Sequence, residues 1–191
     1  MVVTPVSHRQ PSAALPRFAL VLLRTLVAWH FLYEGYYKAM LPAWSGAGDP
    51  LGPWSAASYL AAASGPLAGL FHTLGSPPLA STIDTLVIIA LIAVGLSLML
   101  GLFTQAGCGV ALALLTLFYL AHIPLAGVLE AGAEGAYLLV NKTLVEWAAV
   151  VTLWTQHTGR IAGLDCLIAR EIRGTHDQPP GHERLAEGAA L

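Results

Sequence analysis

The sequence predicts an all-α membrane protein, a four-helix transmembrane bundle with both termini in the cytoplasm. Of its 191 residues, 56% are hydrophobic and 10% are charged, whereas soluble domains carry about 25% charged residues. Four apolar stretches approach the ~20 residues that cross a bilayer: about 17–40, 82–103, 106–123 and 135–156. The loops between them at 41–81 and 125–135 contain no Lys or Arg. The positive-inside rule therefore places both loops on the outer side.

Composition and charge also limit the function. The net charge of −2 gives no support to a nucleic-acid partner. Cys108 and Cys166 lie far apart and in no metal-binding pattern, so the sequence indicates neither a disulfide framework nor a metal site. We expect residues 1–16 to be a cytoplasmic leader, 17–166 to be the membrane domain and 167–191 to be a cytoplasmic tail.

The first predicted helix carries four ionisable residues in an apolar stretch, Arg24, His30, Glu34 and Lys38. A charge at the centre of a membrane helix costs about 2.5–3.5 kcal/mol, so such side chains face protein or water. His30, Glu34 and Lys38 follow one another at i, i+4 and share one face. That face either binds a ligand or packs a neighbouring helix. We expect Arg24 to be a structural anchor, with Asp165 as a candidate partner near the inner surface.

The loop at 41–81 contains an uncharged segment, 55–75, that resembles a fifth spanning helix. Gly65 and Pro66 interrupt it, and its Ala, Ser and Gly residues insert weakly. If it spanned the membrane, the Arg-bearing tail would lie opposite the N-terminus, which the positive-inside rule disfavours. We therefore predict one or two short helices on the outer face.

The second and fourth predicted helices add polar residues near their starts. Asp84 falls in the first turn of the second helix, where the helix dipole favours an anion, and we expect it to be structural. The fourth helix opens with Asn141, Lys142 and Glu146. Lys142 and Glu146 are four residues apart and can pair locally. Gly101, Gly107 and Gly109 permit close approach of helices at the junction of the second and third.

The predicted topology gathers these polar residues in the outer half of the bundle. We expect a polar pocket there, roofed by the 41–81 loop with Trp44, Trp54, Tyr59 and His72. Glu34 and Glu146 are the candidate proton-relay residues. The candidate ligand-binding residues are His30, Lys38, His122, Asn141 and Lys142. Residues with an expected structural role are Arg24, Asp84, Arg160 and Asp165.

Several short motifs carry a family resemblance over about residues 17–166. They are Leu22-Leu23-Arg24, Gly35-x-x-Lys38, Gly101-Leu102-Phe103-Thr104, Val140 to Glu146, Thr158-Gly159-Arg160 and Gly163-Leu164-Asp165. With these the chain resembles the DoxX/DoxD family of four-helix membrane proteins of bacteria and archaea. Gln105 departs from the pattern, since a basic residue is more usual there. The resemblance implies a multi-pass protein of the cytoplasmic membrane, with partner subunits or a homo-oligomer.

The resemblance implies a redox role, because DoxD-like proteins form the membrane subunit of thiosulfate:quinone oxidoreductase. A quinone cofactor needs hydrogen-bond donors and a proton source in an apolar slot. Yet the chain has no CxxC pair, Rossmann glycine motif or iron–sulfur cysteine set. The alternative is a non-catalytic membrane scaffold or accessory subunit of a larger complex. Haem ligation by His30 and His122 is disfavoured by the charged residues beside them.

Overall fold

The computed structural model describes residues 14–40, 54–64, 66–123, 139–168 and 171. Within these ranges the regular structure is helical and contains no strand. Three helices are long and apolar enough to cross a membrane: α1 (Ala14–Met40), α4 (Leu79–Leu100) and α5 (Thr104–Ala121). A shorter fourth helix, α6, covers Lys142–Thr155. The predicted all-α class is therefore confirmed for the described residues, and the three apolar helices are those expected of a multi-pass membrane protein.

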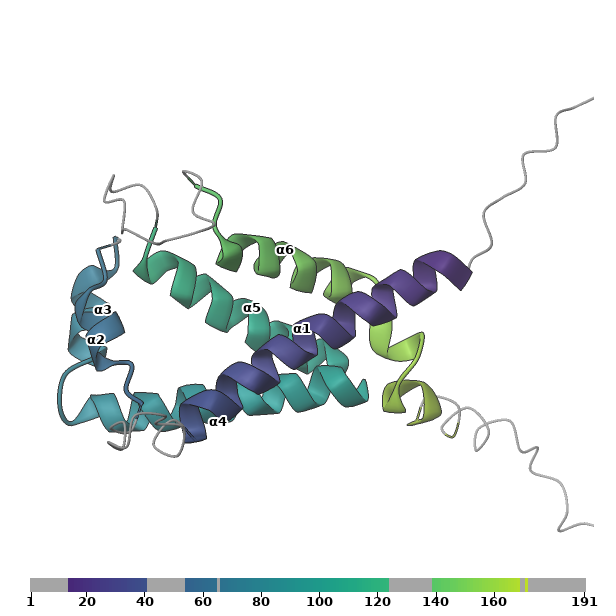
Figure 1. Ribbon diagram of the computed structural model, residues 1–191, viewed down its shortest axis with the longest axis horizontal. Helices are drawn as coiled ribbons and strands as arrows, with labels where there is room; N and C mark the ends of the chain where they lie inside the picture. The colour runs from purple at the N-terminus through teal and green to yellow at the C-terminus, as the bar shows by residue number, and fades with distance from the viewer. Residues whose placement is uncertain (1–13, 41–53, 65, 124–138, 169–170, 172–191) are drawn as a thin grey trace, which may run out of the picture.

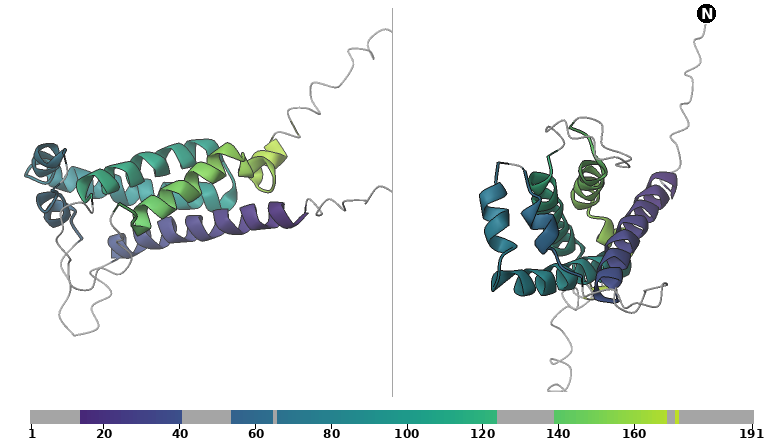
Figure 2. Two further views of the ribbon diagram at one scale, coloured as in Figure 1. Left: turned by 90° about the horizontal axis from the view of Figure 1, so that it is seen from above. Right: turned by 60° about the vertical axis from the view of Figure 1, so that its left-hand side comes forward.

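The long helices lie alongside one another, and the short α-helices α2 and α3 lie together at one end (Figures 1 and 2). This roof end holds α2 (Ala57–Ala61) and α3 (Ala68–Leu74). The opposite base end holds the start of α1, the α4–α5 turn and the 3-10 helix η2 (Thr158–Arg160). The two ends of the described chain thus lie together, away from the roof.

The main core lies where α1, α4, α5 and α6 meet. Its buried members include Phe31, Val94, Leu98, Cys108 and Leu153. They come from all four helices, and each is at most 2% exposed. Burial of their apolar surface stabilises the packing of α6 with the three longer helices.

The α4–α5 turn lies earlier in the chain than predicted, by three residues at the end of α4 and by two at the start of α5. The sequence placed the helices at 82–103 and 106–123, whereas α4 ends at Leu100 and α5 begins at Thr104. Gly101 adopts φ 64° and its N–H bonds the carbonyl of Ser97, which ends α4 in a left-handed cap. The following apolar residues therefore belong to a turn although their composition suits a helix.

The start of α6 also differs from the prediction, because Asn141 is its N-cap. The Asn141 side chain accepts a hydrogen bond from the Leu144 N–H at 2.9 Å, which satisfies a donor of the first turn. The predicted start at 135 lies outside the described residues, as do the predicted leader up to residue 13, Trp44 and the tail from residue 172.

The roof is fastened to α4 and α5 by hydrogen bonds that the sequence did not indicate. Asp84 on α4 accepts from the backbone N–H of Ala56 at 2.7 Å. The Tyr59 hydroxyl donates to the carbonyl of Phe118 on α5 at 3.1 Å. Asp84 thus joins α4 to the roof, and it lies beyond the first turn of α4, which begins at Leu79.

Candidate functional site

A cavity of about 380 Å³ lies beneath the roof, between α1, α6 and the parts of α4 and α5 near the roof. Besides the phenol of Tyr59, five ionisable side chains line it: His30, Glu34, Lys38, Lys142 and Glu146. Its apolar lining comes from Phe31, Leu60, Ile83, Val87, Leu91, Leu115 and Phe118. Polar groups from two helices therefore face a largely apolar wall.

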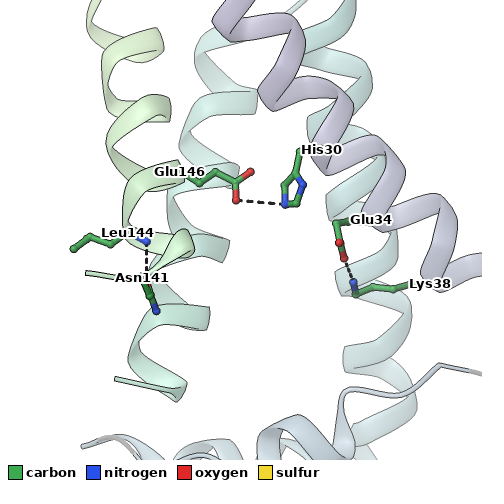
Figure 3. A network of polar contacts seen from close by, with 6 residues as sticks. All are labelled: His30, Glu34, Lys38, Asn141, Leu144 and Glu146. Atoms are coloured by element: carbon green, nitrogen blue, oxygen red, sulfur yellow. Dashed lines mark hydrogen bonds and ion pairs between the residues drawn. The ribbon is translucent and has the colours of Figure 1, made fainter. Parts of the chain in front are cut away.

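One face of α1 supplies three of the ionisable groups. The i, i+4 spacing of His30, Glu34 and Lys38 stacks them along the cavity (Figure 3). The Lys38 ammonium donates to the Glu34 carboxylate. It also lies 5.3 Å from the centre of the Trp54 ring, within cation–π range. These contacts hold this part of the cavity wall in place.

His30 and Glu146 face one another from α1 and α6 (Figure 3). His30 Nε2 is 3.5 Å from Glu146 Oε2. The side chains are only 34% and 13% exposed, so this contact is shielded from bulk solvent. The pair is an imidazole and a carboxyl group at ion-pair distance, an arrangement able to hold and exchange a proton.

Lys142 differs from the other charged groups because it makes no hydrogen bond or ion pair within the described ranges. It opens α6 directly after the Asn141 cap and lines the cavity. Glu146, its expected local partner, contacts His30 instead. Among the described residues, the Lys142 ammonium is therefore the cavity cation without a hydrogen bond or ion pair, although its charge still acts on the Glu146 carboxylate.

Two predicted ligand-binding residues lie outside the cavity lining. Asn141 uses its side chain to cap α6. His122 ends α5, and its ring lies 4.1 Å from that of Tyr59, measured between centroids. Tyr59 itself lines the cavity, and burial raises the pKa of its phenol. His122 thus supports a lining residue and does not reach the cavity.

The roof contributes two of the four aromatic and histidine residues that the sequence singled out. Trp54 and Tyr59 line the cavity. His72 Nε2 instead contacts the carbonyl of Ala63 at 3.1 Å, within the roof. The sequence analysis did not single out Phe118, which lines the cavity. Leu115 and Phe118 are three residues apart on an apolar helix, and this spacing indicates that both side chains face the same side.

A second polar cluster lies at the base end and holds three segments together. Arg24 is 4% exposed, and its Nη1 donates to the carbonyl of Thr158 at 2.9 Å. The Asp165 carboxylate accepts from the N–H groups of Phe103 and Thr104 at 2.8 and 3.0 Å. Partial burial raises the pKa of Asp165, but these N–H groups and the Arg24 charge outweigh it and leave the pKa below its usual value.

Glycines let the base-end segments touch. A Cβ at Gly159 would lie 2.3 Å from Thr104 Oγ1 and 2.4 Å from Asp165 Oδ2. One at Gly163 would lie 2.8 Å from the Cα of Gly101. The stretches 101–104, 158–160 and 163–165, which carry much of the family resemblance, therefore meet at one place and serve packing. Arg160 has a different environment, because its side chain is exposed and lines a groove at the base end.

The described residues contain no group of three or more His, Cys, Asp or Glu side chains placed to hold a metal ion. Both cysteines are free thiols. Comparisons with protein-family models, curated proteins and solved structures find no match to this chain. A functional proposal for the protein thus depends on the geometry of the cavity and on the sequence motifs.

Proposed function

We propose that this protein is a DoxX-like membrane subunit of a redox complex and that it binds a quinone in the cavity beneath the roof. The observation that carries the proposal is the convergence of five ionisable side chains on a largely apolar cavity. In this proposal α6 completes a four-helix bundle in a bacterial or archaeal cytoplasmic membrane. Both termini are cytoplasmic, and the roof lies on the outer side.

The cavity has the chemistry that a quinone headgroup requires. The headgroup is a flat apolar ring with two carbonyl acceptors, and the bound cofactor accepts two electrons and two protons. A volume of about 380 Å³ lies within the range of small-molecule sites, about 300–1,000 Å³, which are mostly apolar with a few placed polar groups. The aromatic rings of Phe31, Trp54 and Phe118 in the lining supply flat apolar surface.

The ionisable residues have separate roles in this proposal: one donates a hydrogen bond to the ligand, and a pair holds a proton near it. Lys142 donates to a ligand carbonyl, because its ammonium makes no hydrogen bond or ion pair within the described ranges. Glu146 and His30, 3.5 Å apart, hold a proton close to the same space. Lys38 is engaged by Glu34 and Trp54, so it shapes the cavity and positions Glu34.

Electrons must come from a partner subunit in this proposal. The sequence has no evident carrier motif of its own. Thiosulfate as the electron donor follows from the family resemblance alone, and nothing in the cavity is specific to it. The proposal therefore assigns quinone binding to this chain and leaves oxidation of the donor to the partner.

Quinone affinity of the purified full-length protein tests the proposal. The probe is a short-chain ubiquinone analogue, and the signal is quenching of tryptophan fluorescence, because Trp54 lines the cavity. We expect saturable quenching in the wild type and a Kd at least about tenfold higher for Lys142→Met, which is about 1.4 kcal/mol of lost binding.

The matched control is Thr152→Val, on the same helix but exposed and outside the cavity lining. Its Kd should stay within about twofold of the wild type, because the change removes no lining group. Thermal unfolding checks that both variants remain folded. An unchanged Kd in folded Lys142→Met protein would contradict the proposal, as would the absence of saturable quenching.

A scaffold function is the second candidate, and the internal pairing of the charges favours it. Four of the five ionisable groups contact one another as Lys38–Glu34 and His30–Glu146. The His30–Glu146 pair joins α1 to α6 without any ligand, whereas the Lys38–Glu34 pair lies within α1. The scaffold proposal predicts that Glu146→Gln loosens α1 from α6 and reduces recovery of partner subunits. The quinone proposal predicts weaker quinone binding in a complex that remains intact.

A further inference from the structure

A second groove, of about 400 Å³, lies at the base end, opposite the cavity beneath the roof. Its lining includes Phe103, Ala106, His157, Arg160, Asp165 and Ile168. We propose that this groove binds the headgroup of an anionic phospholipid, with the first part of an acyl chain against its apolar side. The inference is independent of quinone binding and rests on the membrane-spanning character of α1, α4 and α5.

Arg160 gives the groove a cation with no internal partner. It is exposed at the end of η2 and makes no hydrogen bond or ion pair within the described part of the chain. A guanidinium fork binds phosphate oxygens through two parallel N–H donors. His157 lies in the same lining, where its Nδ1 contacts the carbonyl of Thr155 at 3.1 Å.

The carboxylate in the lining does not compete for Arg160, because other groups occupy it. Asp165 accepts from the N–H groups of Phe103 and Thr104. Arg24 adds positive charge from within the base end and favours the ionised carboxylate. The negative charge of Asp165 is therefore offset by groups behind the groove, and Arg160 remains the charge at its mouth.

The apolar part of the groove distinguishes a lipid from a free anion. Phe103 is 71% exposed and Ile168 is 43% exposed, although both are large apolar side chains. They lie beside Arg160 in the same lining, at the end of the molecule where α4 ends and α5 begins. The ends of helices that span a bilayer lie where phospholipid headgroups meet acyl chains. Inorganic phosphate would leave this apolar surface uncovered, whereas a lipid covers it.

Native mass spectrometry of the delipidated full-length protein tests the inference. Dioleoyl phosphatidylglycerol is the anionic probe, and dioleoyl phosphatidylcholine is the zwitterionic one. We expect the wild type to bind the anionic lipid about tenfold more tightly, and Arg160→Gln to lose most of that preference. Arg17→Gln is the matched control, because Arg17 is an exposed cation near the start of α1 that lies outside the groove lining. Its preference should stay within about twofold of the wild type.

Three outcomes would overturn the inference. Equal losses in Arg160→Gln and Arg17→Gln would mean that diffuse surface charge attracts the lipid. Equal binding of the two lipids by the wild type would mean that no headgroup site exists. Displacement of the lipid by an equal concentration of glycerol phosphate would identify a free-anion site. An additional variant, Ile168→Ser, should weaken lipid binding and leave any glycerol phosphate binding unchanged.

Discussion

Arg24 and Asp165 at the base end are held mainly by backbone groups. Arg24 donates to the Thr158 carbonyl, and Asp165 accepts from two N–H groups of the α4–α5 turn. The N–H groups at the start of a helix lack intrahelical partners, and the Asp165 carboxylate satisfies two of them at the start of α5. The sequence indicated that Arg24 needed a partner. It did not identify a backbone carbonyl, because every residue carries one.

Asp165→Asn should destabilise the protein at neutral pH and have less effect in acid. The folded-state pKa of Asp165 is lowered, so its ionised form contributes stability above the unfolded pKa of about 3.9. That contribution is lost as the pH falls through the folded-state pKa. Thermal unfolding in detergent at pH 7 and pH 3 measures it. The Tm gap between variant and wild type should narrow in acid, and a gap of constant size would contradict this account.

The packing of α1 on α4 depends on two glycines that let the helices approach closely. A Cβ at Gly95 would lie 2.6 Å from the backbone nitrogen of Leu32. A Cβ at Gly35 would lie 2.7 Å from Ile92 Cγ1. Such distances are shorter than van der Waals contact, so a larger residue must push the helices apart. This crossing holds α1, and with it His30, against the rest of the molecule.

Gly95→Ala should therefore cost about 1–3 kcal/mol by overpacking. The matched control is Gly109→Ala on α5, because a Cβ there meets no atom within 4 Å. The control should be neutral or stabilising by up to about 1 kcal/mol, since Ala favours helix more than Gly does. Thermal unfolding of both variants decides the point. Equal unfolding temperatures for the two variants would show that α1 and α4 can move apart at this crossing without loss of stability.

The elements themselves were largely predictable, but their ends were not. Long apolar runs located α1, α4 and α5 to within three residues. The exact ends depend on local backbone geometry, such as the left-handed Gly101 and the capping side chain of Asn141. The sequence also grouped Gly109 with Gly101 and Gly107 as a close-approach position. That was wrong for Gly109, which faces open space, because composition does not specify which face of a helix is packed.

At the scale of the whole molecule, the fold places its polar groups at two opposite ends. The roof end has a cavity with five ionisable side chains, and the base end has the Arg24 and Asp165 cluster beside the groove that Arg160 lines. Helical spacing and topology sufficed to predict that His30, Glu34 and Lys38 share a face. The pairing of Glu146 with His30 rather than Lys142 depends on the register between α1 and α6, which one sequence does not reveal.

The quinone content of the natively purified protein shows whether the cavity beneath the roof binds a quinone. The tagged protein is extracted in mild detergent, and mass spectrometry quantifies the extracted quinones and the copurifying proteins. We expect near-stoichiometric quinone in the wild type and in Thr152→Val, and its loss in Lys142→Met. Quinone no higher than in an unrelated membrane protein purified from the same cells would contradict the account. If partner subunits were recovered in that case, the cavity beneath the roof would be assigned to the scaffold function.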